Sequence, residues 1–544
     1  MPLFLAFVVA LSITAALIPL LARWAPVIGL TDQPGPRKVH SSPVPRVGGL
    51  AMTAGLLAPV LFAVPLTAPV RGLLLGVGVL LLFGLWDDRF TLGYRAKFTG
   101  QLIAVVLCMI VGGIRVGPFG IGLVEALPAP LAALITFVFL VGITNAVNLA
   151  DGLDGLAGGM VLLCLCAIAL FAAMSGNGAV TMIALSEAGA VFGFLRFNTH
   201  PARIFMGDSG SQILGFSVGT LALLATQGDS SALSAALPLL LLGLPIVDTF
   251  TVMVTRIRAG RSPFSADRNH LHHRLLALGF AHREAVLLVY LMQVGLVLCA
   301  YFMRFASDAS VVLAFCAFAA GLLGLLQWTS WSGWRLSPPS ASGGVRGYLN
   351  GLLPGARISG VALAVMAASL AAYAAAVLAA TRRIGMDLGL TFFALLGVLL
   401  LLSFWKAERS LRRLERMAAY LCVLLLVYLD QTMPHKPPLL TELCWAAIAV
   451  TGLAALLRFW VTQRGSFELT TLDLIIIFIA LVLPNLPGFV ALPADLPGGI
   501  AKAVILLYVV EMLLTSDVKP LGRRVFLGAT LGVIAARALI AFGA

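Results

Sequence analysis

Residues 155–175 read G-L-A-G-G-M-V-L-L-C-L-C-A-I-A-L-F-A-A-M-S, an apolar run without a single charged side chain. As an α-helix, a run of this length crosses the hydrocarbon core of a bilayer with its backbone groups paired internally. Runs of about 17–25 apolar residues recur from one end of the chain to the other. They do not alternate residue by residue as the strands of a membrane barrel do. The sequence therefore predicts an all-α, polytopic membrane helix bundle.

The overall composition agrees with this class. Of the 544 residues, 60% are hydrophobic and only 11% are charged, and the mean hydropathy is +1.03, far from the norm of soluble proteins. The net charge of +13 would suit a nucleic-acid ligand, but the Lys and Arg residues cluster between the apolar runs and form no basic stripe. We therefore expect membrane lipid, and no nucleic acid, as a partner.

The apolar runs fall into two modules. Residues 331–357 are rich in Ser, Gly, Pro and Trp, which predicts an interfacial linker. About eleven spans are expected in the module 1–330. The first is expected to be a retained helix, because no basic region precedes it and no convincing small-residue cleavage site follows it before Arg23; a cleaved signal peptide is the alternative. Those spans lie near 2–22, 48–66, 69–86, 99–113, 129–147, 155–175, 178–195, 211–227, 233–250, 285–303 and 309–327. About seven more are expected in a C-terminal module of unknown function, residues 358–544. They lie near 358–380, 388–405, 417–433, 442–460, 470–484, 500–515 and 525–542.

The basic residues predict an orientation. If the N-terminus lies outside, the inside loops of the first module hold fifteen Lys and Arg residues and the outside loops hold only Arg71, Arg115 and Arg304. The positive-inside rule favours this arrangement. The loops rich in Asp, Asn and His are the same inside loops, so polar chemistry is expected to gather on the cytoplasmic face.

Acidic residues occur at two span ends. Asp87 and Asp88 end the third span, where carboxylates are costly unless they reach water, a cation or a partner; a solvated helix end is the alternative. Adjacent helical residues point about 100° apart, so the pair is not expected to face one ligand equally. Asn148, Asp151 and Asp154 follow at three-residue spacing, which on a helix places them on one face and calls for a cation between the acids. An Asp-Gly turn is the alternative for this loop.

The next inside loop reads F-N-T-H-P-A-R-I-F-M-G-D-S-G-S from residue 197. Asp208 between glycines suits a hard cation, and Arg203 suits a phosphate. Asn198 is a further substrate-binding candidate. Phe205 could stack on a base, although an interfacial aromatic residue is the simpler interpretation.

A cluster of histidines fills the last large inside loop. His270, His272 and His273 lie together, flanked by Arg268 and Arg274. The spacing of His270 and His273 resembles that of zinc ligands, but no carboxylate or thiol set accompanies them. Phosphate binding by the His/Arg cluster is the better fit.

These motifs, in this order, resemble the polyprenyl-phosphate N-acetylhexosamine-1-phosphate transferases over roughly residues 1–330. The branch that starts O-antigen, enterobacterial common antigen or teichoic acid with N-acetylglucosamine 1-phosphate is favoured. Leu271 interrupts the run of three histidines typical of the peptidoglycan translocase that uses a UDP-muramoyl pentapeptide, so that alternative ranks lower. The motifs are D-Q-P-G-P-R-K-V-H (32–40), P-R-V-G-G (45–49), W-D-D-R-F (86–90), N-A-V-N-L-A-D-G-L-D-G-L (145–156), the 197–211 loop and D-R-N-H-L-H-H-R-L (267–275).

The resemblance implies the site. Asp87 and Asp88 would be the catalytic acidic pair, Asp208 with Asp88 the metal ligands, and Lys97 the phosphate-site lysine. Asn148, Asp151 and Asp154 would form the nucleotide loop, and Phe205 the base-stacking position. The expected catalytic residues are Asp87, Asp88, Asp151, Asp154, Asp208, His270, His272 and His273. The expected substrate-binding residues are Lys97, Asn148, Asn198, Arg203, Phe205 and Arg268.

The implied reaction transfers N-acetylhexosamine 1-phosphate, with N-acetylglucosamine preferred, from a UDP-sugar to undecaprenyl phosphate and releases UMP. The implied cofactor is Mg²⁺, with Mn²⁺ as a substitute, and the implied location is a bacterial inner membrane. A phosphate monoester is already mostly dianionic at neutral pH, so direct attack by the lipid phosphate is preferred to a covalent phospho-aspartyl intermediate. A transporter or lipid-handling protein is the alternative from another class, and a homodimer is left open.

Overall fold

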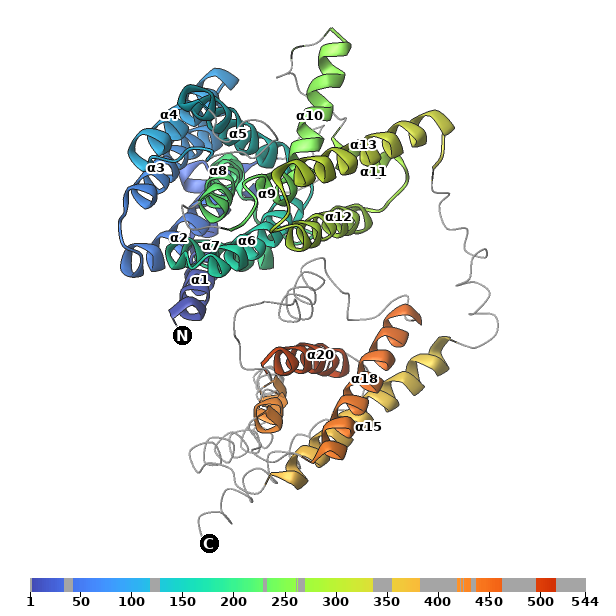
Figure 1. Cartoon of the computed structure of the whole chain (residues 1–544). Coiled ribbons are helices and arrows are strands. Elements are labelled where there is room, and N and C mark those ends of the chain that lie inside the picture. Colours follow the sequence, from blue (N-terminus) through green and yellow to red (C-terminus); the bar gives the residue numbers. More distant parts are fainter. Residues whose placement is uncertain are drawn as a thin grey trace. The chain divides into compact units, whose positions relative to one another are not determined.

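Long apolar helices form most of the structure, a computed structural model (Figure 1). It describes residues 2–33, 43–117, 128–227, 232–260, 262, 270–335, 355–381, most of 418–431, 437–461 and 496–514. Within these residues eleven helices are long and apolar enough to cross a membrane, nine before residue 338 and two after it. The predicted all-α polytopic bundle is confirmed, and the protein is a multi-pass membrane protein.

The chain divides into two compact units, and Met1–Pro338 makes up nearly all of the first. Its two short strands, β1 (Thr31–Asp32) and β2 (Val44–Pro45), pair antiparallel. Its helices are α1 (Pro2–Ile28), α2 (Gly48–Ala63), α3 (Ala68–Phe90), α4 (Tyr94–Gly112), α5 (Ala129–Ala150), α6 (Leu156–Met174), α7 (Gly178–Asn198), α8 (Gly207–Thr226), α9 (Leu237–Leu241), α10 (Gly243–Arg258), α11 (Leu271–Ala277), α12 (His282–Phe302) and α13 (Asp308–Ser332).

Helices α6 and α8 lie at the centre of the first unit. Of the most apolar stretch of α8, 94% is buried, against 11% for α13. Helices α2, α3, α5 and α6 all pack against α8 (Figure 1). The approach is closest at glycines, because a Cβ on Gly84 would lie 2.3 Å from the Cα of Ser209 and one on Gly49 would lie 2.3 Å from the Gly210 nitrogen. The start of α8 is therefore held by backbone contact with α2 and α3.

One predicted span is wrong in its continuity. The run 233–250 was expected to form a single helix, but α9 ends at Leu241 and α10 begins at Gly243. Gly243 and Pro245 weaken the helix at this point, since Gly is flexible and Pro lacks the N–H that would continue the hydrogen-bond ladder. The break lets α10 end in the polar segment that carries Arg256 and Arg258.

The second unit contains α15 (Gly355–Ala380), helical residues within Ala418–Gln431, α18 (Pro438–Val461) and α20 (Leu496–Leu514). Lys502 and Asp430 form a buried ion pair there, with Nζ 2.5 Å from Oδ2. Glu511 accepts a hydrogen bond from Tyr420. The expected spans 388–405, 470–484 and 525–542 lie outside the described residues, as does 336–354 of the expected linker; the domain boundaries stay a prediction.

Candidate active site

Asp88 anchors the start of α8. Its Oδ1 accepts a hydrogen bond from the Asp208 N–H at 2.8 Å, and its Oδ2 accepts from the N–H and the hydroxyl of Ser209 at 3.2 and 2.7 Å. A carboxylate in this position pairs N–H groups that the helix itself leaves free and complements the positive end of the helix dipole. Only 4% of Asp88 is exposed. This structure thus gives Asp88 a positioning role, and its expected role as a metal ligand stays a prediction.

Lys97 joins two carboxylates from distant parts of the chain. Its Nζ lies 2.7 Å from Asp87 Oδ2 and 2.7 Å from Asp208 Oδ2. Asp87 also accepts the Leu92 N–H, just beyond the end of α3, at 2.5 Å. The neighbours Asp87 and Asp88 therefore contact different groups, as their helical separation predicts.

Asn148 and Asp151 complete the acidic cluster from the end of α5. Asn148 donates to Asp208 Oδ1 at 2.6 Å and to the Ser211 hydroxyl at 2.7 Å. Asp151 ends α5 as its C-cap residue. Burial, followed by the charges of Asp208, Asp154 and Asp88, raises the pKa of Asp151 to about 7. The cluster therefore carries more negative charge than Lys97 alone offsets, which is the condition that favours binding of a further cation.

Three of the expected substrate-binding residues lie in or beside the 199–206 loop. Asn198 is buried and serves the backbone, accepting the Gly155 N–H and donating to the Ile204 carbonyl, both at 2.9 Å. The backbone of Phe205 bonds to Pro45 and Gly48, so the P-R-V-G-G motif supports this loop. Arg203 is exposed. Arg268 lies outside the described residues.

The histidine cluster lies against the loop that carries Asp151 and Asp154. A Cβ on Gly152 would lie 2.3 Å from His272 Nε2, so the ring and the D-G-L-D segment are in direct contact. His272 is 3% exposed, and its Nε2 has no hydrogen-bond partner among the described residues. Burial and the neighbouring His273 lower the pKa of His272 to about 4. A neutral ring with a free buried nitrogen can therefore hydrogen-bond a ligand here.

Several polar residues of this region were missing from the sequence-based site. Asp248 of α10 holds the histidine segment, because its carboxylate lies 3.0 Å from His270 Nδ1 and accepts the Leu271 N–H at 2.7 Å. His200 and His282 lie beside Asp154. Asp248 could have been identified from the sequence, because an acidic residue inside the apolar run 243–258 indicates a functional or buried polar contact. The two isolated histidines gave none, because their partners lie far away in sequence.

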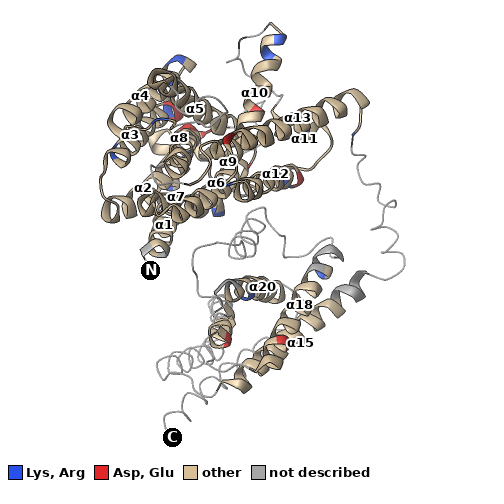
Figure 2. Cartoon of the chain, in the orientation of Figure 1, with Lys and Arg blue, Asp and Glu red and all other residues tan. Residues whose placement is uncertain are grey.

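The predicted site residues that are described come from segments far apart in the chain and gather in one region. The termini of α3, α4, α5 and α8 meet there, next to the start of α11. Figure 2 shows that most of each helix in the first unit carries no charge and that the charged residues lie mainly toward helix ends. An arrangement of carboxylates, one lysine and imidazoles can hold a divalent cation and phosphate groups.

Comparisons with known proteins show the family to which the chain belongs. The model of glycosyl transferase family 4 matches residues 70–226. A probable undecaprenyl-phosphate N-acetylglucosaminyl 1-phosphate transferase of Bacillus subtilis (strain 168) is 39% identical over 290 residues, which cover 53% of this chain and 80% of that protein. The decaprenyl-phosphate N-acetylglucosaminephosphotransferase of Mycolicibacterium smegmatis is 38% identical over 319 residues, which cover 52% of this chain and 78% of that protein.

A more distant relative extends the comparison. The undecaprenyl-phosphate alpha-N-acetylglucosaminyl 1-phosphate transferase of Escherichia coli O157:H7 is 31% identical over 269 residues, covering 48% of this chain and 73% of that protein. The chain belongs to the family of polyprenyl-phosphate N-acetylhexosamine-1-phosphate transferases, and it is a glycosyl-1-phosphate transferase.

Proposed function

We propose that the protein transfers N-acetylglucosamine 1-phosphate from UDP-N-acetylglucosamine to undecaprenyl phosphate, releases UMP and requires Mg²⁺. The reaction would take place on the cytoplasmic face of a bacterial inner membrane and start a lipid-linked envelope glycan. The names of the relatives in Bacillus subtilis and Escherichia coli support the sugar and the lipid. The excess of basic residues in the inside loops supports the orientation.

One observation carries the proposal: Lys97 lies between Asp87 and Asp208, with Asn148 beside them. Ionisable side chains are costly to place within membrane helices, and those that occur there commonly mark functional sites. It offers a positive charge for phosphate oxygens and carboxylates for a metal within one contact network.

Asp87 and Asp208 fit a magnesium ion best. Both carboxylates lie 2.7 Å from the Lys97 Nζ, so a cationic group already occupies a position between them. Oxygen ligands of this kind suit Mg²⁺, whereas both oxygens of Asp88 are engaged by α8. When bound, Mg²⁺ would offset the charge of the donor's diphosphate.

The protein's own groups then position the reactants. Lys97 would bind phosphate oxygens, and Asn148 would keep Asp208 oriented. His272, neutral at pH 7, would hydrogen-bond the diphosphate or the sugar. The lipid phosphate is mostly dianionic at neutral pH and needs little help from a general base, so direct attack on the β-phosphorus with UMP as the leaving group is the preferred course.

The test is UMP release by full-length protein in detergent, with and without undecaprenyl phosphate. We expect activity with UDP-N-acetylglucosamine and Mg²⁺, none with EDTA, and a fall of about 10³-fold, equivalent to about 4 kcal/mol, in Asp208→Asn. Transfer from UDP-muramoyl pentapeptide instead would identify the peptidoglycan-type reaction. UMP released without lipid, together with labelled phosphosugar bound to protein, would support the covalent route.

A further inference from the structure

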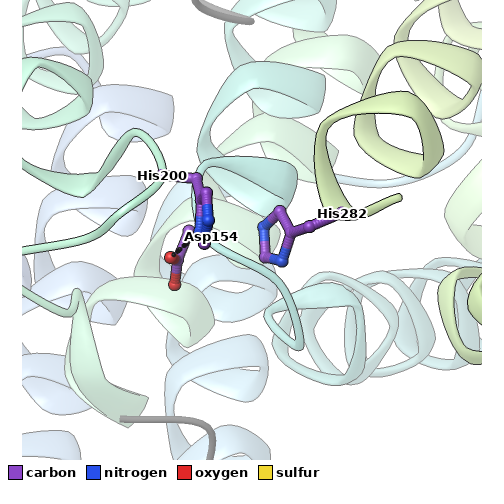
Figure 3. Close-up of side chains that lie close together, drawn as sticks. All are labelled: Asp154, His200 and His282. Atoms are coloured by element: carbon purple, nitrogen blue, oxygen red, sulfur yellow. Dashed lines mark hydrogen bonds and ion pairs between the residues drawn. The ribbon is translucent and has the colours of Figure 1, made fainter. Parts of the chain in front are cut away.

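We propose that Asp154, His200 and His282 form a second metal site, selective for a transition-metal ion of the Zn²⁺ class and separate from the magnesium site. In the described part of the chain they are the one group of three His, Cys, Asp or Glu side chains with ligand atoms within 4.8 Å of one another. Figure 3 shows the three side chains facing one another, with the imidazole of His282 beside that of His200.

The three residues come from three separate segments. Asp154 belongs to the loop between α5 and α6, His200 to the loop between α7 and α8, and His282 is the first residue of α12. Both loops adjoin the acidic cluster around Asp208. Tyr290 of α12 donates a hydrogen bond to the Gly155 carbonyl at 2.6 Å, so α12 is docked on the first loop independently of any ion.

The geometry suits metal binding. His200 Nδ1 lies 2.7 Å from Asp154 Oδ2, and the rings of His200 and His282 are stacked with centroids 4.1 Å apart. Two ligand atoms on a tetrahedral zinc ion are about 3.3 Å apart, given zinc–ligand distances of about 2.0–2.2 Å. The three ligand atoms lie within 4.8 Å of one another, so each pair is within about 1.5 Å of that spacing.

Independent evidence for a ligand comes from the hydrogen bonding of His282. Its Nε2 is buried without a hydrogen-bond partner, although the ring also bonds to the backbone of Asp154. Since Nε2 makes no bond, Nδ1 makes the one to the carbonyl and leaves Nε2 with a free lone pair. Metal-binding histidines typically donate their second ring N–H to a carbonyl or carboxylate in this way.

The donor set distinguishes this site from the one at Asp208. Two imidazoles and one carboxylate suit zinc or a neighbouring transition metal, whereas Mg²⁺ prefers oxygen ligands alone. Three protein ligands leave a fourth position for water. The ion would cross-link the two loops that frame the acidic cluster to α12, and so restrict their movement.

The experiment uses full-length protein in detergent, freed of any histidine tag and stripped with EDTA, and titrated with Zn²⁺ against a chromophoric chelator. Wild-type protein should bind one ion per chain, and binding should raise the midpoint of thermal unfolding. His282→Ala and His200→Asn should each weaken binding at least tenfold. His435→Ala, which removes an imidazole from elsewhere in the sequence, should leave binding unchanged.

Three results would overturn the proposal: no Zn²⁺ bound by wild-type protein, equal binding by wild type and His282→Ala, or loss of binding in Asp208→Asn, which would place the ion in the magnesium site. If His282→Ala fails to fold, His282→Gln replaces it. Co²⁺ absorption by wild-type protein provides a readout without any variant. Visible bands of a tetrahedral nitrogen and oxygen site support the proposal, and their absence contradicts it.

Discussion

The substitution Asp88→Asn separates a positioning role for this residue from a metal-binding one. Asn keeps one acceptor oxygen where Asp has two, so at least one of the three hydrogen bonds from the start of α8 is lost and a buried donor faces an amide N–H. An unsatisfied buried donor costs about 1–3 kcal/mol, and loss of the charge at a helix N-terminus costs up to about 2 kcal/mol. We expect the free energy of unfolding to fall by about 2–4 kcal/mol.

The same change should move Asp208, because the Asp208 N–H is one of the donors that Asp88 holds. Displacement of a reacting group by about 1 Å costs about 10²-fold in rate. We therefore expect kcat for UMP release at saturating Mg²⁺ to fall by about 10²-fold, together with the loss of stability. Thermal unfolding in detergent and steady-state kinetics with a Mg²⁺ titration measure the two effects.

A matched control removes an acid with similar local bonding elsewhere. Asp308 accepts hydrogen bonds from the Ser234 hydroxyl and the Ala236 N–H, beside the far end of α12 from His282. Asp308→Asn should lower stability and leave kcat unchanged. A positioning role is contradicted if Asp88→Asn keeps wild-type stability and instead raises the half-saturating Mg²⁺ concentration tenfold or more, because Asp88 would then be a ligand of the ion.

Three further outcomes follow from the site. Lys97→Met leaves the carboxylates of Asp87 and Asp208 without their shared cation, so the rate of UMP release should fall at least about 10²-fold. A rate within threefold of wild type would contradict a role for Lys97 in binding phosphate. Gly152→Ala places a methyl group against His272 and should lower kcat, whereas Gly142→Ala, where a Cβ meets nothing within 4 Å, should not. The pKa of Asp151 is about 7 in the folded protein, against 3.8 for a free side chain. Between these two pH values the folded protein therefore binds more protons than the unfolded chain. Its stability falls as the pH rises through that range. In EDTA, Asp151→Asn should therefore melt at a higher temperature than wild type at pH 8, with a gap that shrinks toward pH 4; a gap independent of pH would refute this.

The sequence predicted the helical class well because long apolar runs have few other solutions in a bilayer. Helix ends were harder to predict. The span expected from residue 211 begins at Gly207, because Asp88 supplies an acceptor for its first N–H groups from 120 residues away in sequence. Hydropathy averaged over a window also hid the break between α9 and α10, although Gly243 and Pro245 were visible signals.

The sequence predicted which polar residues lie together, but it did not predict which groups each of them contacts. Asp87, Asp208 and Asn148 stood out as polar groups at the ends of apolar runs, and they do lie together. Whether a side chain contacts a ligand or another part of the protein depends on partners that no local pattern specifies. Asn198 illustrates this. It is a candidate for substrate binding from the sequence, yet its side-chain oxygen accepts a hydrogen bond from the Gly155 N–H and its side-chain nitrogen donates one to the Ile204 carbonyl.

The contacts at Gly49 and Gly84 restrict how this enzyme can be altered. Backbone touches backbone there, so no side chain can change rotamer to absorb an added methyl group. Any bulk inserted at these positions must displace α8 as a whole and carry Asp208 with it. Efforts to alter the enzyme should therefore leave the contacts of α8 with α2 and α3 intact.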